Sequence, residues 1–167
     1  MTTLADALSA AFPGVRADLE ALVRIPSVSA DGPDTPAMRE CAERVRALLA
    51  GVGLSTRLLE VPGAPAAVFG ERRGPDGAPT VLLYAHYDVQ PAGDLSAWRT
   101  TPFEPAERDG RLYGRGASDD KAGFATHLGA LRVLPSDLSL TIKVVVEGEE
   151  ELGSPHAADL LARYAAE

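Results

Sequence analysis

Apolar residues recur at helical spacing in two stretches near the start of the chain. The first runs from Leu4 to Val23; it contains Pro13 and is closed by Pro26, so we expect one long helix or two shorter pieces. The second begins at Thr35, which can cap a helix that has Pro36 in its first turn. This second helix should end where two glycines follow (Gly51 and Gly53).

The same pattern predicts two further helices in the second half of the chain. One runs from Lys121 to Leu134. Ser154 can cap the other, with Pro155 in its first turn, and this last helix continues through Leu160 towards Glu167.

Between these helices lie shorter apolar segments that we interpret as strands. Val81 to Ala85 is a continuous apolar run of the kind expected for a strand covered on both faces. The other expected strands are Ser55 to Val61, Ala67 to Arg72 and Leu138 to Val146. This alternation of strands and helices favours an α/β fold, a largely parallel sheet flanked by helices.

Composition restricts the class of protein. The 167 residues suffice for one domain with a sizeable core, and no apolar run approaches the roughly 20 residues that a membrane helix needs. A formal charge of −8 disfavours nucleic acid and anionic membranes as partners. The amino terminus lacks the pattern of a secretory signal, and a single cysteine, Cys41, cannot form an internal disulfide. Both features favour a cytoplasmic location.

Acid-rich clusters follow two of the expected strands and precede one expected helix. They are His86 with Asp88, Asp119 with Asp120, and Glu149 to Glu151. Each cluster also has a structural explanation, as a satisfied loop histidine, a helix cap or a solvated acidic face. In open α/β sheets, however, ligands bind outside the carboxyl ends of the strands, so three such clusters together indicate a site.

The residue types in these clusters indicate a metal. Imidazole and carboxylate ligands without thiolate suit zinc and would also admit manganese or cobalt. Asp88 is well placed to accept the other ring N–H of His86, which would fix the tautomer of the imidazole. Of two adjacent glutamates, one can bind metal while its neighbour takes a proton from a water molecule.

Three segments, in this order and at these separations, resemble one family. "HYDVQPAGD", "LYGRGASDDKAG" and "EGEEELGS" are similar to the co-catalytic zinc peptidases that include carnosine dipeptidases, aminoacylases and glutamate carboxypeptidases. The segment containing Trp98 and Phe103 is most similar to the dipeptidase branch. The resemblance spans almost the whole chain.

The resemblance implies a role for each acidic cluster. His86 becomes a metal ligand, Asp88 the residue that orients it, and Asp119 the carboxylate that bridges two zinc ions. Aligning "EELGS" from its glycine makes Glu150 the general base and Glu151 a metal ligand. Glu149 is then left outside the site. A cis peptide bond is implied between Asp119 and Asp120, and Ala122 stands where many relatives have a glycine.

The resemblance also implies that residues 1–167 form the amino-terminal portion of a catalytic domain. The lid and dimerisation domain, the remaining ligands and the rest of the catalytic domain would lie beyond Glu167, and the full-length form would be a homodimer. Two hypotheses remain. One is a two-zinc enzyme that hydrolyses the amide bond of dipeptides or N-acyl amino acids. The other is a non-catalytic fragment or interaction module that keeps the fold and binds metal weakly. His127 and His156 are expected to be ordinary helix residues.

Overall fold

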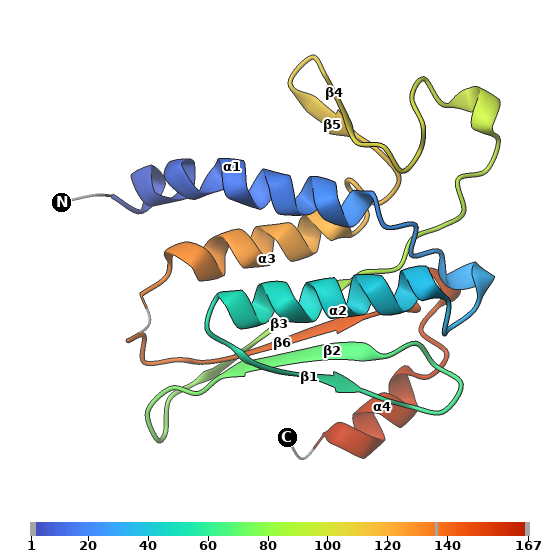
Figure 1. The fold of residues 1–167 in the computed structure, drawn as a ribbon. Coiled ribbons are helices and arrows are strands. Elements are labelled where there is room, and N and C mark those ends of the chain that lie inside the picture. The colour runs from blue at the N-terminus through green and yellow to red at the C-terminus, as the bar shows by residue number, and fades with distance from the viewer. Residues whose placement is uncertain (1–2, 136, 166–167) are drawn as a thin grey trace.

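A four-stranded sheet forms the centre of the molecule, and helices pack on both of its faces (Figure 1). The computed structural model describes residues 3–135 and 137–165. The α-helices are α1 (Leu4–Val23), α2 (Pro36–Gly51), α3 (Lys121–Val133) and α4 (Ala157–Tyr164). The strands are β1 (Ser55–Leu59), β2 (Ala67–Arg72), β3 (Thr80–His86), β4 (Ala106–Arg108), β5 (Arg111–Tyr113) and β6 (Thr141–Glu147). The chain is therefore an α/β protein, as its sequence predicts.

The expectation of a largely parallel sheet is wrong. In the order β1-β2-β6-β3, the β1/β2 and β2/β6 pairs are antiparallel, and only β3 and β6 run parallel. The connections between the strands explain why most pairs are antiparallel. Parallel neighbours need a crossover, which α3 provides between β3 and β6, whereas short loops without a helix join β1 to β2 and β2 to β3.

The first two helices begin as their sequences predict. The hydroxyl of Thr35 accepts the N–H of Met38, and Pro36 occupies the first position of α2. At the start of α1, Thr3 and Asp6 form a reciprocal cap. Pro13 lies inside α1 without dividing it. In the described part of the chain, no helix is both long and apolar enough to span a bilayer.

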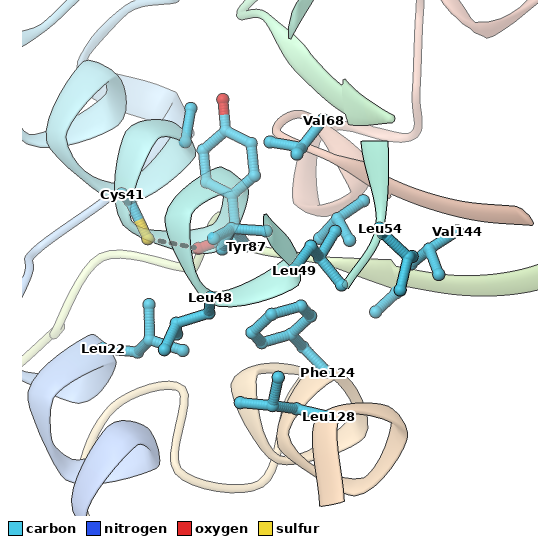
Figure 2. Close-up of a cluster of buried hydrophobic side chains, with 14 of the residues drawn as sticks. Leu22, Cys41, Leu48, Leu49, Leu54, Val68, Tyr87, Phe124, Leu128 and Val144 are labelled. Atoms are coloured by element: carbon cyan, nitrogen blue, oxygen red, sulfur yellow. Dashed lines mark hydrogen bonds between the residues drawn. The ribbon is translucent and has the colours of Figure 1, made fainter. Parts of the chain in front are cut away.

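The main core lies between the sheet and helices α1 to α3. Figure 1 shows these three helices on one side of the sheet, with α1 beside α3. Leu49 of α2, Phe124 of α3 and Val144 of β6 are buried in this layer (Figure 2). Tyr87 joins it immediately after β3, and its carbonyl accepts hydrogen bonds from Ser27 Oγ at 2.7 Å and Cys41 Sγ at 3.8 Å.

Helix α4 covers the opposite face of the sheet. Leu160 and Tyr164 pack against Phe69 and its buried neighbours on β1 and β2. This helix does not begin at Ser154 as expected, because the Ser154 hydroxyl donates to Glu147 Oε1 at 3.0 Å; His156 is the cap residue instead. The helix ends at Tyr164, and the expected end at Glu167 lies outside the described residues.

Strand β3 was expected to be covered on both faces, and that expectation is wrong. Among the described residues β3 pairs only with β6, so it forms the edge of the sheet. Its apolar side chains Val81, Leu82 and Tyr84 are exposed, Leu82 by 62%. An apolar run alone does not reveal how many neighbours a strand has.

A small hairpin, β4 and β5, lies in the segment that the sequence pattern left irregular. Asp109 and Gly110 join its strands, with φ values of 50° and 72°. An Asp-Gly pair with positive φ is the usual composition of a two-residue hairpin turn, so this signal was present in the sequence.

Candidate metal centre

The three acidic clusters meet at one end of the parallel strand pair. His86 is the last residue of β3 and lies in register with Glu147, the last residue of β6. The loop after β6 carries Glu149 to Glu151, and Asp119 comes just before α3. Because β3 and β6 are parallel, both carboxyl ends lie at the same edge of the sheet, where open α/β sheets bind ligands.

Asp88 connects the histidine to the glutamate loop. His86 Nδ1 lies 3.1 Å from the carbonyl oxygen of Asp88 and 3.2 Å from its Oδ1. The same carboxylate accepts the backbone N–H groups of Glu150 and Glu151, each at 3.2 Å. Asp88 is fully buried. One carboxylate therefore sets both the ring orientation of His86 and the position of the glutamate backbone.

The charge around His86 favours a cation at this place. Burial lowers the pKa of the imidazole. The hydrogen bond to Asp88 and the charges of Asp88, Glu150 and Asp120 raise the pKa by more than burial lowers it, from 6.5 to about 9. The ring is therefore protonated at neutral pH in the metal-free protein. Carboxylates surround a buried imidazole that is only 4% exposed, so the site carries a surplus of negative charge.

The second ring nitrogen of His86 faces the remaining candidates. His86 Nε2 lies 3.1 Å from Asp119 Oδ1 and 3.5 Å from Glu150 Oε2. Two ligands held by one tetrahedral zinc ion lie about 3.3 Å apart, given metal–ligand distances of roughly 2.0 to 2.1 Å. Both spacings are close to this value, so the donor set and the distances suit a metal ion beside His86. The side chains of Asp119 and Glu150 are 77% and 45% exposed, so this group opens to solvent.

Glu151 does not join this group. Its Oε2 and its carbonyl oxygen accept hydrogen bonds from Gln90 Nε2, at 2.9 Å and 3.0 Å. Within the described ranges, no three or more histidine, cysteine, aspartate or glutamate side chains are grouped so that they could hold a metal ion. Asp119 and Glu150 each lie near Nε2 of His86 without forming such a group, and Asp88 links the backbone of Glu151 to His86.

Sequence reasoning missed the contribution of Asp120. The peptide bond between Asp119 and Asp120 is cis, as the resemblance implied. Asp120 Oδ2 accepts the backbone N–H of His86 at 3.3 Å, which links the start of α3 to the end of β3. A Cβ at Gly123 would lie 2.0 Å from Asp120 Oδ1, so a glycine is needed there. Ala122, by contrast, is accommodated at its position.

The start of α3 is fixed by a buried ammonium group. Lys121 is 1% exposed, and its Nζ donates to the carbonyls of Leu22 at 2.8 Å and Ile25 at 2.7 Å. These carbonyls lie at the end of α1 and just beyond it, and each also accepts a backbone N–H: that of Leu22 from Ile25 at 3.0 Å and that of Ile25 from Ser27 at 2.9 Å. Lys121 therefore anchors the segment that carries Asp119 to α1.

Comparisons with known proteins identify the family of the chain. Residues 82–167, just over half of the chain, match the family described as peptidase family M20/M25/M40. The chain is 46% identical over 117 residues to cysteinylglycine-S-conjugate dipeptidase of Corynebacterium striatum, covering 68% of this chain and 26% of that protein. It is 36% identical over 135 residues to β-Ala-His dipeptidase of Mus musculus, covering 75% and 27%.

Solved structures extend the similarity to nearly all of the fold. The structure of human carnosine dipeptidase 1 matches with a TM-score of 0.86 and 28% identity, over 96% of this chain and 38% of that one. The chain spans about a quarter of the length of the two curated relatives. The matched segment contains His86, Asp119 and the glutamate loop, and we conclude that the chain belongs to the peptidase family M20/M25/M40.

Proposed function

We propose that this chain supplies the amino-terminal part of a two-metal centre that hydrolyses an amide bond in dipeptides or related N-acyl amino acids. The observation that supports this most strongly is the 3.1 Å separation of His86 Nε2 and Asp119 Oδ1 beside a surplus of carboxylates. Zinc is the proposed metal, with manganese or cobalt as substitutes.

The proposed ligands are His86, Asp119 and Glu151, with Asp119 shared between two ions. When bound, the metals would supply Lewis-acid polarisation of the amide carbonyl and of a water molecule. Asp88 keeps the imidazole of His86 in one orientation, because its oxygens meet Nδ1 and leave Nε2 free to face Asp119.

Glu150 is the proposed general base. Its carboxylate is partly exposed and lies 3.5 Å from His86 Nε2, at the solvent side of the group. From there it can accept the proton of the attacking water and pass it to the leaving amine. The N–H groups of Glu150 and Glu151 both donate to Asp88, so the buried aspartate fixes the backbone of the proposed base.

Each proposed ion has only two ligands in this chain. We propose that residues 1–167 are the amino-terminal portion of the catalytic domain, and that the other ligands and a lid and dimerisation domain belong to the full-length protein, a homodimer. Two relatives are named as dipeptidases, one for cysteinylglycine S-conjugates and one for β-Ala-His. These names favour a small peptide over nucleic acid or membrane as the partner. A cytoplasmic location remains part of the proposal.

A second function is favoured by the hydrogen bonds between Gln90 and Glu151, which keep the proposed second ligand apart from His86. The isolated chain would then be a non-catalytic module that binds metal weakly. Zinc stoichiometry and dipeptide hydrolysis, measured on the 167-residue chain and on the full-length protein, separate the two. About two tightly held zinc ions with turnover, in the full-length protein, support the first function. One ion or none, without turnover, in both proteins supports the second.

A further inference from the structure

Glu149, the first acid of the glutamate loop, uses its carboxylate away from the metal centre. The residue is only 6% exposed. Its Oε1 accepts the backbone N–H of His156 at 2.8 Å, and its Oε2 lies 2.9 Å from Nδ1 of the same residue. Both carboxylate oxygens are thus occupied by one residue at the start of α4. We call this pair of contacts the Glu149–His156 clasp.

The backbone of Glu149 also makes two hydrogen bonds within the same loop. Its carbonyl oxygen accepts the N–H groups of Leu152 at 3.1 Å and Ser154 at 3.0 Å. Ser154 has a φ of 50°, in the left-handed region that residues other than glycine rarely adopt. A loop that contains such a residue needs several fixed contacts to hold it, and Glu149 provides four of them.

The clasp and Asp88 hold the glutamate loop through different contacts. Asp88, just after β3, accepts the N–H groups of Glu150 and Glu151, whereas Glu149 binds the residue that caps α4. Two buried carboxylates therefore fix the backbone of the two proposed site residues. Removing either one should leave the glutamate side chains attached at a single end.

His156 can hold the loop because α4 is itself fixed to the sheet. Tyr164 packs on the face of the sheet opposite to α1, α2 and α3. Its hydroxyl oxygen lies 3.2 Å from both the backbone nitrogen and the carbonyl oxygen of Glu60. Leu160 packs in the same cluster. The clasp therefore connects the glutamate loop to an element whose position the sheet determines.

We propose that Glu149 is a positioning residue of the metal centre: through the clasp with His156 it fixes the backbone from which Glu150 and Glu151 reach the site. This inference rests on the proposed function, because it assumes that Glu150 and Glu151 act there. In this proposal Glu149 acts through the backbone and is not a metal ligand; both of its carboxylate oxygens contact His156.

The test compares two substitutions of Glu149 in the 167-residue chain. Glu149→Ala removes the clasp. Glu149→Gln keeps an oxygen for the His156 N–H and a polar group for the imidazole, so it should rescue the loop. Leu131→Ala, in the buried part of α3, is the control, because it destabilises the fold without touching the loop.

The first readout needs no metal. We expect the amides of Glu150 and Glu151 to exchange hydrogen about tenfold faster in Glu149→Ala, and at nearly the wild-type rate in Glu149→Gln and Leu131→Ala. Unchanged exchange in Glu149→Ala, or equal acceleration in the control, would overturn the proposal.

The second readout is zinc affinity by calorimetry, below the unfolding temperature of every variant. Glu149→Ala should bind zinc about tenfold more weakly, and Glu149→Gln should match the wild type. Faster exchange with unaltered zinc affinity overturns the proposal, because the clasp would then order the loop without serving the site. If the unsubstituted chain takes up no zinc, zinc affinity is measured on the full-length protein. Absence of zinc there as well contradicts the proposed function, and the exchange measurement then decides alone whether the clasp positions the loop.

Discussion

Nε2 of His86 and Oδ1 of Asp119 lie 3.1 Å apart although 33 residues separate them in the sequence. The intervening segment includes the β4–β5 hairpin and returns to the same edge of the sheet through the cis peptide bond after Asp119. Lys121, two residues after Asp119, anchors this part of the chain to the end of α1. The fold thus places an imidazole and a carboxylate at the spacing of two ligands of one ion.

The proposed roles of Glu150 and Asp119 separate when each is substituted. In the active protein, Glu150→Gln should lower kcat by roughly 10²- to 10⁴-fold while zinc content stays nearly unchanged, because the base holds a proton and not the metal. Asp119→Asn should lose zinc together with activity, because Asp119 is the shared ligand. Turnover and zinc content are measured on the same preparations. Equal metal loss in both variants contradicts the roles.

The raised pKa of His86 makes the stability of the metal-free chain depend on pH. The folded-state value of about 9 lies above the ordinary value of 6.5, so the stabilisation is complete below 6.5 and is lost as pH rises through about 9. With a chelator present, the free energy of unfolding should therefore fall across this range. Asp88→Asn should make the fall smaller. Urea denaturation at several pH values measures it, and a curve that stays flat or rises contradicts the prediction.

Gly148 allows Tyr87 to pack beneath the glutamate loop. A Cβ at Gly148 would lie 2.3 Å from the Tyr87 hydroxyl oxygen, and that hydroxyl donates to the carbonyl of Ala66 at 2.9 Å. Gly148→Ala should therefore cost about 1 to 3 kcal/mol of unfolding free energy. Gly51→Ala is the matched control, because nothing lies within 4 Å of the new Cβ and the position is helical. Thermal or urea unfolding of both variants checks this, and equal stabilities would refute the packing argument.

The exposed edge strand should make the isolated chain associate. Val81, Leu82 and Tyr84 present apolar area on a strand that has a single neighbour in the described part of the chain. Leu82→Lys should shift the association to higher concentration, because a charge on an edge strand opposes pairing with another chain. Sedimentation of both chains measures this, and a well-behaved monomer of the unsubstituted chain would count against it.

Local sequence signals predicted most of the helices. Thr35 and Pro36 define the start of α2 by interactions within four residues of each other, and this prediction is confirmed. The start of α4 was placed two to three residues too early, because Glu149 holds the His156 N–H while Ser154 turns to Glu147. A hydrogen bond to a residue seven positions away has no short-range signal.

Sheet order and strand burial could not be predicted in the same way. The run Val81–Ala85 looks the same in a central strand and in an edge strand, since its neighbours come from distant parts of the chain. The proximity of the acidic clusters was easier to predict, because the sequence already places His86, Asp88 and the glutamates at the ends of strands. What it could not reveal was that Asp88 holds the backbone of Glu150 and that Gln90 occupies Glu151.

His86 and Asp119 are proposed to bind one metal ion together. Anomalous diffraction at the zinc edge, from crystals of the protein grown with zinc, locates that ion. We expect a zinc ion within about 2.0 to 2.2 Å of both His86 Nε2 and an Asp119 carboxylate oxygen. Zinc bound elsewhere, with the imidazole of His86 still hydrogen-bonded to Asp119, would contradict it.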